Sequence, residues 1–122
     1  MVNQQVMKRE QEIYEILEEM KSSNILVIVE GKKDKSALKS FGIENVMVLK
    51  KALHEVIEEA AESNKEIILL TDLDKEGKQL YGRLNSGLQK YGVRVNNKFR
   101  DFLMKNTKLR QIEGLRRYAD AL

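Results

Sequence analysis

The chain of 122 residues has no cysteine, one histidine and no long apolar run. The absence of cysteine excludes a disulfide framework, a thiol nucleophile and a cysteine-based zinc site. No segment approaches the roughly 20 apolar residues that a membrane-spanning helix needs, and the N-terminus lacks the apolar region of a signal peptide. We therefore expect a cytoplasmic protein with no membrane partner. The single histidine, His54, is expected on the surface near the start of a helix.

The composition indicates a globular protein, with 42% hydrophobic and 34% charged residues. The length is sufficient for one domain with one core, so we expect residues 1–122 to form a single domain.

The charge is distributed unevenly, although the net charge is only +3. Residues 1–77 carry 11 Lys and Arg against 16 Asp and Glu, whereas residues 78–122 carry 11 against 3. An acidic half followed by a basic half favours a phosphodiester ligand, because carboxylates hold a metal while cations hold the phosphate backbone. The alternative is that these charges are solvated faces of helices.

Two short acidic motifs each follow a continuous apolar run. Residues 25–29 precede Glu30-Gly31, and residues 67–71 precede Asp72-Leu73-Asp74. A continuous apolar run is typical of a strand covered on both faces, as in a parallel sheet between layers of helices. Ligands of such sheets bind beyond the carboxyl ends of the strands. We therefore expect the acids of both motifs at one edge of the sheet.

These acids are candidate metal ligands. Asp72 and Asp74 are two positions apart, which in extended backbone directs both carboxylates to one side. Glu76 could add a third oxygen, directly or through water. Carboxylates without His or Cys indicate Mg²⁺, with Mn²⁺ as the alternative. The competing interpretation is that they are solvated loop and cap residues.

The two motifs resemble those of the Toprim domain, the catalytic module shared by topoisomerases, bacterial primases and several small nucleases. Glu30-Gly31 matches the Glu-Gly element of that family, and Asp72-Leu73-Asp74 matches its Asp-x-Asp element. Leu73 stands where many members have proline, so the loop lacks the fixed backbone angle that proline imposes.

The resemblance covers about residues 25–95 and implies an α/β, Rossmann-like fold with a central, mostly parallel four-stranded sheet flanked by helices. The apolar periodicity and the glycines give the expected elements. The expected strands are residues 25–29, 46–49, 67–71 and 93–95. The expected helices are residues 33–41, 53–62 and 76–90, an N-terminal helix at 3–21 and a basic helical extension at 98–120. The N-terminal helix is expected to pack on the edge of the sheet, and binding a protein partner is the alternative. Its apolar stripe is too short to define an oligomeric state.

The resemblance also implies a chemistry. In the family, the residue matching Glu30 acts as a general acid or base, or helps to hold metal. A small stand-alone Toprim protein resembles the group that contains the bacterial 5S ribosomal RNA maturase, which implies a Mg²⁺-dependent endonuclease acting on structured RNA, with DNA left open. The alternatives are a non-catalytic module for nucleic-acid binding or assembly, and a hydrolase of small phosphorylated metabolites. Tyr81 is not expected to act as a topoisomerase nucleophile.

Other residues are candidates for holding phosphate or bases. Gly31 and Gly77 would let the backbone approach phosphate, and Asp34 is either a helix N-cap or a site acid. Phe99 and Phe102 could stack on bases, although core packing is favoured. Cations beside the acids or in the basic half could contact phosphate: Lys32, Lys33, Lys75, Arg83, Arg94, Lys98, Arg100, Lys105, Lys108, Arg110, Arg116 and Arg117.

Overall fold

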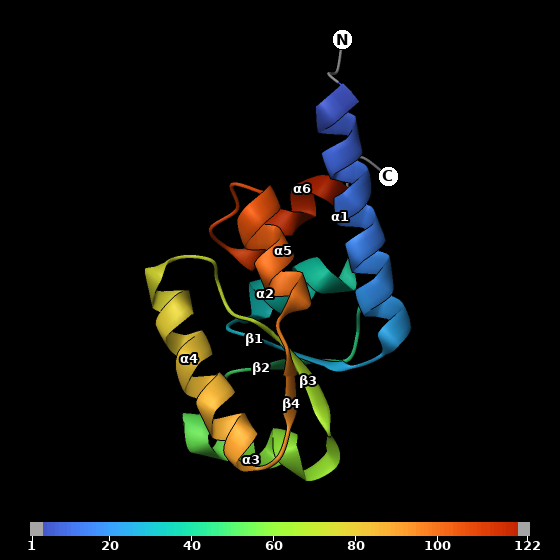
Figure 1. The fold of residues 1–122 in the computed structure, drawn as a ribbon. Coiled ribbons are helices and arrows are strands. Elements are labelled where there is room, and N and C mark those ends of the chain that lie inside the picture. The colour runs from blue at the N-terminus through green and yellow to red at the C-terminus, as the bar shows by residue number, and fades with distance from the viewer. Residues whose placement is uncertain (1–3, 120–122) are drawn as a thin grey trace.

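The computed structural model describes residues 4–119, in which helices and strands alternate along most of the chain (Figure 1). The strands are β1 (Leu26–Val29), β2 (Val46–Val48), β3 (Glu66–Leu70) and β4 (Arg94–Asn96). The helices are α1 (Gln4–Ser23), α2 (Lys32–Lys39), α3 (Leu53–Ser63), α4 (Lys75–Lys90), α5 (Lys98–Asn106), the 3-10 helix η1 (Ile112–Leu115) and α6 (Arg116–Ala119).

The four strands form one sheet in the order β2-β1-β3-β4, and every neighbouring pair is parallel. In the register of the central strands, Val27 lies opposite Val46 on one side and Ile68 on the other. Because all strands run the same way, their carboxyl ends share one edge of the sheet. The expected four-stranded α/β fold is therefore confirmed.

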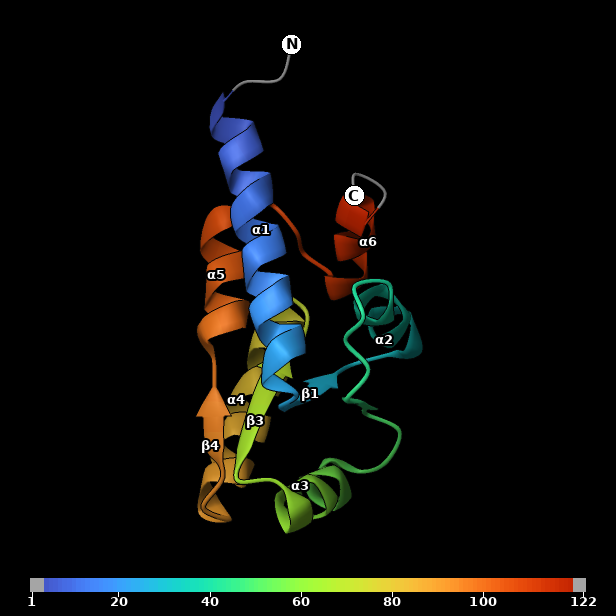
Figure 2. The same ribbon diagram turned by 90° about the vertical axis from the view of Figure 1, so that its right-hand side faces the viewer.

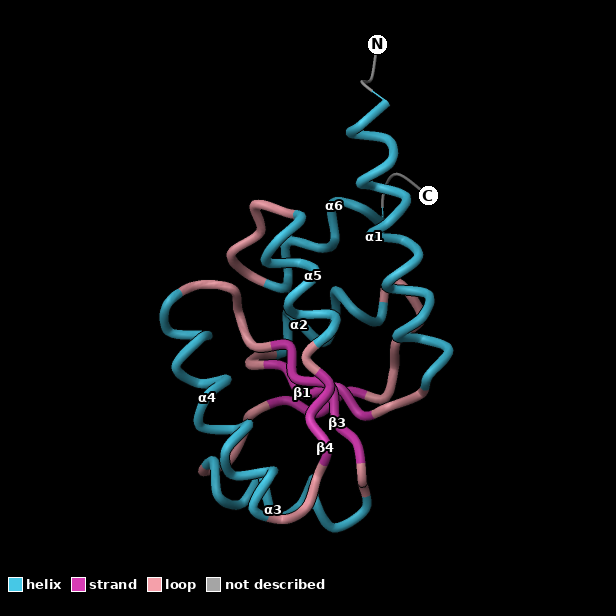
Figure 3. Tube along the Cα trace, in the orientation of Figure 1, coloured by secondary structure: helices cyan, strands magenta, loops and turns pink. Residues whose placement is uncertain are grey.

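Helices cover both faces of the sheet, as Figures 1 and 3 show. Val27 and Val29 of β1 belong to the apolar cluster that α1, α2, α5 and η1 share, whereas Leu26 and Ile28 belong to the cluster of α3 and α4. All four β1 residues are buried. This two-sided burial explains why the strands read as continuous apolar runs instead of alternating ones.

The C-terminal part departs from the sequence-based expectation. A basic helical extension is expected at residues 98–120, of which residue 120 lies outside the described residues, but α5 ends at Asn106 and a non-helical stretch precedes η1. Thr107 stops the helix, because its hydroxyl donates to the carbonyl of Leu103 at 2.6 Å and accepts from the amide of Leu109 at 3.2 Å. Such local side-chain bonds compete with helix continuation. The freed backbone of residues 107–111 then reaches the edge where the acidic motifs end.

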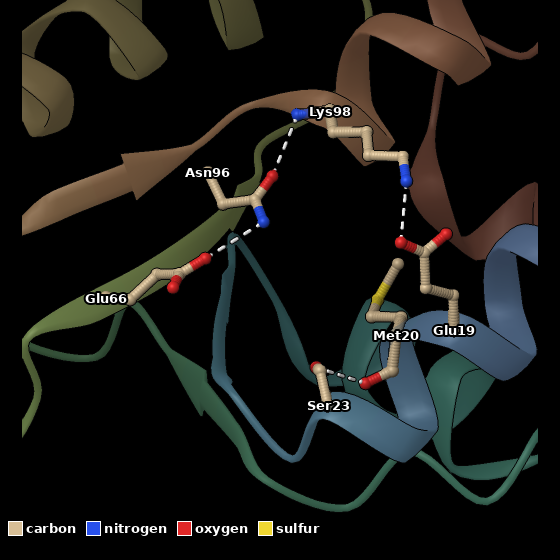
Figure 4. A network of polar contacts seen from close by, with 6 residues as sticks. All are labelled: Glu19, Met20, Ser23, Glu66, Asn96 and Lys98. Carbon is tan, nitrogen blue, oxygen red and sulfur yellow. Dashed lines mark hydrogen bonds and ion pairs between the residues drawn. The ribbon is translucent and has the colours of Figure 1, made fainter.

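A series of polar contacts links β3, β4 and α5 to the N-terminal helix α1 (Figure 4). Asn96 bonds Glu66 on β3 and the amide of Lys98, each at 3.0 Å. The ammonium of Lys98 then pairs with Glu19 of α1 at 2.6 Å. Figure 2 shows α1 and α5 side by side, consistent with this link. Within residues 4–119, no helix is both long and apolar enough to cross a membrane.

Candidate metal and phosphate site

Glu30 directly links the two acidic motifs. It follows β1 at the carboxyl edge of the sheet, and its Oε2 accepts a hydrogen bond from the backbone amide of Asp72 at 2.7 Å. The parallel pairing of β1 with β3 places the ends of these two strands next to each other. Residues that are 42 positions apart in the sequence thus meet at one edge of the sheet, as the motifs predict.

Asp72 is held on three sides by other parts of the chain. Its amide donates to Glu30, its carbonyl accepts from Nη2 of Arg100 at 2.8 Å, and its Oδ1 accepts from the amide of Ile112 at 2.9 Å. These contacts come from the residue that follows β1, from α5 and from η1. The position of this carboxylate is therefore set by the surrounding fold.

Asp74 begins the next helix. It is the N-cap residue of α4, and its Oδ1 accepts from the amide of Gly77 at 2.8 Å. This bond satisfies one of the amide donors that the first turn of any helix leaves without a partner. The second oxygen of the carboxylate makes no hydrogen bond within the described part of the chain.

Gly77 brings the first turn of α4 against the loop of Asp72. A Cβ atom at this position would lie 1.9 Å from the carbonyl oxygen of Asp72, a distance that no real side chain tolerates. The buried hydroxyl of Thr71 donates to the carbonyl of Gly77 at 2.7 Å and closes the same contact. Glycine is therefore required here because two backbone segments lie in close contact. This contact explains the glycine without the expected contact between backbone and phosphate.

Asp34 braces the loop after β1. The N-cap of α2 is Gly31, and Asp34 is the third residue of that helix, so the first of the two alternatives for Asp34, the N-cap, does not hold. Its Oδ2 accepts from the amide of Gly31 at 3.0 Å and its Oδ1 from the amide of Glu113 at 3.1 Å. Both oxygens are thus engaged by backbone amides, which gives the carboxylate a positioning role.

The acids lie close enough to affect one another. Burial raises the pKa of Glu30; the hydrogen bond from Asp72 lowers it, and the charges of Asp72 and Asp74 raise it again, with a net rise. Burial, followed by the charge of Asp72, likewise raises the pKa of Asp34. Gathering these carboxylates therefore costs free energy, which a proton or a bound cation would relieve.

Arg100 is buried beneath the second motif. Its Nε donates to the carbonyl of Thr71 at 3.2 Å, its Nη2 donates to that of Asp72, and its guanidinium lies 4.9 Å from the ring centroid of Tyr81. Only 4% of the residue is exposed, and this burial lowers its pKa. The expectation that Arg100 contacts phosphate is therefore wrong, because its donors are used to hold the loop.

The donor set fits Mg²⁺, although no three His, Cys, Asp or Glu side chains converge as a ready-made metal site in residues 4–119. One oxygen each of Glu30, Asp72 and Asp74 accepts a backbone amide, and within that part of the chain the other makes no hydrogen bond. Mg²⁺ keeps several waters and needs only one or two carboxylates. Glu76 is exposed in the first turn of α4.

The site opens into a cleft of about 450 Å³. Lys32 and Lys33 line it together with Glu30, as the sequence predicts, and Gln111 and Glu113 form part of its wall. The contribution of residues 111–113 is missed by the sequence reasoning, which treats them as part of a basic helix. The only available signal is the apolar spacing of Leu109, Ile112 and Leu115, which are all buried.

The other predicted cations lie in different settings. Lys75 and Arg83 are exposed on α4, and Arg94 is exposed on β4. Lys98 is paired with Glu19, and Arg116 donates to the hydroxyl of Ser36 at 2.6 Å. Phe99 is buried and Phe102 is half-buried, both against the core, while His54 is exposed on α3.

Comparisons with known proteins agree with this fold. The Toprim domain matches residues 25–98. The UPF0292 protein MJ1624 of Methanocaldococcus jannaschii is 32% identical over 117 residues, which cover 90% of this chain and 91% of that protein. A solved structure of a protein from Aquifex aeolicus superposes with a TM-score of 0.77 at 34% identity, covering 82% of this chain and 94% of the other. The chain belongs to the Toprim domain family. That membership implies a metal-dependent role connected with nucleic acids, and Toprim domains generally bind Mg²⁺.

Proposed function

We propose that the protein is a Mg²⁺-dependent endonuclease that acts on structured RNA. The observation that carries the proposal is the bond between Glu30 and the amide of Asp72, which joins both acidic motifs in one site beside a cleft lined by lysines. A phosphodiester requires a carboxylate to manage protons and a metal or cation to offset its charge.

Asp72 and Asp74 would hold the metal through the oxygens that make no hydrogen bond in the described residues, with Glu30 nearby. When bound, Mg²⁺ would neutralise the charge that develops on the phosphate oxygens. Glu30 accepts the proton of the water that attacks phosphorus, as the bond from phosphorus to the leaving oxygen breaks. The geometry suits this role, because the second oxygen of Glu30 makes no hydrogen bond within the described residues. Glu30 then returns the proton to the leaving oxygen.

Lysines beside the site would hold the substrate. Lys32 and Lys33 begin α2 at the rim of the cleft, and Lys75 begins α4. Their ammonium groups are point charges suited to phosphate. The grouping with the 5S ribosomal RNA maturase and the preference for RNA over DNA rest on the sequence resemblance. The cytoplasmic location rests on the lack of a long apolar run and of a signal-peptide region, and all three belong to the proposal.

A survey of substrates tests this function. Labelled hairpin RNAs and matched DNAs are incubated with Mg²⁺, with Mn²⁺ and with chelator, using the wild type, Glu30→Gln and the control Glu62→Gln. Glu62 is exposed on α3, away from both motifs. We expect metal-dependent cutting of RNA that Glu30→Gln abolishes and Glu62→Gln retains. Cutting in chelator, or equal cutting by Glu30→Gln, would contradict the proposed role of the site.

A non-catalytic binding module is the second candidate. The observation that favours it is the use of carboxylate oxygens of Asp72, Asp74 and Asp34 as acceptors for backbone amides, since these bonds stabilise the fold without any metal. This candidate predicts salt-sensitive binding of nucleic acid with no cutting under any metal condition. The same survey therefore separates the two.

A further inference from the structure

A series of clefts leads from the acidic site to the N-terminal helix. The cleft of Glu30 shares Gln111 and Glu113 with a second cleft of about 540 Å³, which also touches Asp74. The second cleft shares Lys108 and Arg117 with a third of about 420 Å³, which reaches α1. The three clefts are thus neighbours, each sharing wall residues with the next.

The walls of this path become basic with distance from the acids. The second cleft is lined by Lys108, Arg110 and Arg117. The third cleft adds Arg9 of α1 and Lys105 of α5, and Glu10 is the one acid in its lining. These five residues are here called the basic track. Figures 1 and 2 show α1, α5 and α6, which carry or flank it, on the same side of the sheet.

The track residues differ from three neighbouring cations of residues 98–117, namely Lys98, Arg100 and Arg116. Arg100 is buried, Lys98 is paired with Glu19, and Arg116 is bonded to Ser36. All five track residues are exposed. Ion pairs within residues 4–119 involve none of them. Positive charge that is concentrated in a groove and not neutralised by partners in the fold raises the local concentration of anions.

The folding of residues 107–114 builds this surface. The amide of Leu73 donates to the carbonyl of Arg110 at 2.7 Å, and Nε of Arg117 donates to the carbonyl of Gly114 at 3.2 Å. The first bond fixes the track beside the Asp72–Asp74 loop. The second restrains the guanidinium of Arg117 near the point where the second and third clefts meet.

We propose that the basic track binds the sugar-phosphate backbone of a nucleic acid whose scissile phosphate lies at Glu30 and Asp74. The inference rests on the proposed function. It adds the path that the bound nucleic acid follows away from the scissile phosphate: along residues 105–117 toward Arg9 of α1. The charge complementarity favours a polyanion, and the continuity with the carboxylate site favours a phosphodiester chain over an acidic peptide.

The test compares two double variants that remove the same charge. Lys108→Ala with Arg117→Ala changes the track, and Lys65→Ala with Lys90→Ala changes two exposed lysines outside it, one just before β3 and one at the end of α4. Binding of a fluorescein-labelled hairpin RNA is measured by anisotropy over a salt series, in chelator to prevent cutting. Unfolding midpoints confirm that each variant folds, and Lys105→Ala with Arg110→Ala provides a second track variant.

The track variants should bind on the order of 20- to 60-fold more weakly at about 0.1 M salt, and the slope of log affinity against log salt should flatten by about 1.4–1.8 for two lost phosphate contacts. The control should keep most of the affinity. An equal loss of affinity in the track and control variants, or no loss in the track variants, would contradict the proposed role of the basic track. If the wild type still cuts RNA and Glu30→Gln does not, the proposed function would survive that result. No binding by the wild type would overturn both.

Discussion

The carboxylate of Glu30 accepts the backbone amide of Asp72 at 2.7 Å, so the acid of the first motif is oriented by the main chain of the second. The bond leaves the Asp72 carboxylate itself available to other partners, one of which is the amide of Ile112. The site therefore depends on three segments: the ends of β1 and β3, and the η1 segment that covers them.

The contact between Gly77 and the Asp72 carbonyl should tolerate no side chain. Gly77→Ala would place a methyl group 1.9 Å from that oxygen, and we expect a loss of about 2–3 kcal/mol in the free energy of unfolding. Gly82 is the control on the same helix, because a Cβ there meets no atom within 4 Å. Gly82→Ala should stabilise by about 0.5–1 kcal/mol. Urea unfolding of both variants measures the difference, and equal effects would contradict the close approach.

Arg100 should matter for stability and for the shape of the site without touching substrate. Arg100→Lys removes at least one of the bonds to the carbonyls of Thr71 and Asp72, and we expect a loss of about 1–3 kcal/mol in unfolding free energy. Arg83→Lys, on the exposed face of α4, should be neutral to within about 0.5 kcal/mol. Chemical denaturation checks both, and a neutral Arg100→Lys would show that its buried bonds are dispensable.

Asp74 allows its capping role to be separated from its metal role. Asn is as good an N-cap as Asp but lacks the charge, so Asp74→Asn should keep its stability in chelator, whereas Asp74→Ala should lose about 1 kcal/mol. A Mg²⁺ concentration 100 times the dissociation constant should stabilise the wild type by about 2.7 kcal/mol.

Thermal unfolding with and without Mg²⁺ checks this separation. Asp74→Asn should lose most of the Mg²⁺-dependent gain, and Asp101→Asn on α5 is the matched control that should retain it. Full stabilisation of Asp74→Asn by Mg²⁺ would remove Asp74 from the metal site.

The raised pKa of Glu30 should be visible in the pH dependence of stability. Because burial raises the pKa of Glu30 in the folded state, the folded protein binds the proton of Glu30 more tightly than the unfolded chain does. The contribution of this proton to the free energy of unfolding is lost as the pH rises through the folded-state pKa. Gln at this position stays neutral at every pH. In chelator, the unfolding free energy of Glu30→Gln relative to the wild type should therefore increase as pH rises from acid to neutral. Glu62→Gln should show no such trend, and a flat difference for Glu30→Gln would contradict the shifted pKa.

Much of the fold could be predicted because the strands are unambiguous. Residues 25–29 and 67–71 read as buried strands, and β1 and β3 lie there to within one residue. Glycines mark helix ends equally well, since Gly42 and Gly92 both adopt a positive φ after α2 and α4. The convergence of Glu30 and Asp72 also follows from the sequence, because the ends of parallel strands share an edge.

The η1 segment and Arg100 could not be predicted in the same way. Ile112 and Glu113 act at the site through their backbone amides, which no residue type reveals. Arg100 is an arginine in a basic stretch, and the sequence does not distinguish a guanidinium that bonds carbonyls from one that contacts phosphate. Its burial arises from tertiary packing of α5 against β3.

The central claim is that Glu30 performs metal-dependent proton transfer, and single-turnover cleavage measures it most directly. A labelled hairpin RNA is mixed with excess wild type or Glu30→Gln, with Mg²⁺ or with chelator, after binding is shown to be equal. We expect the wild type to cut only with Mg²⁺ and Glu30→Gln to be slower by about 100-fold or more. Cutting by Glu30→Gln at the wild-type rate, or by the wild type in chelator, would contradict the account.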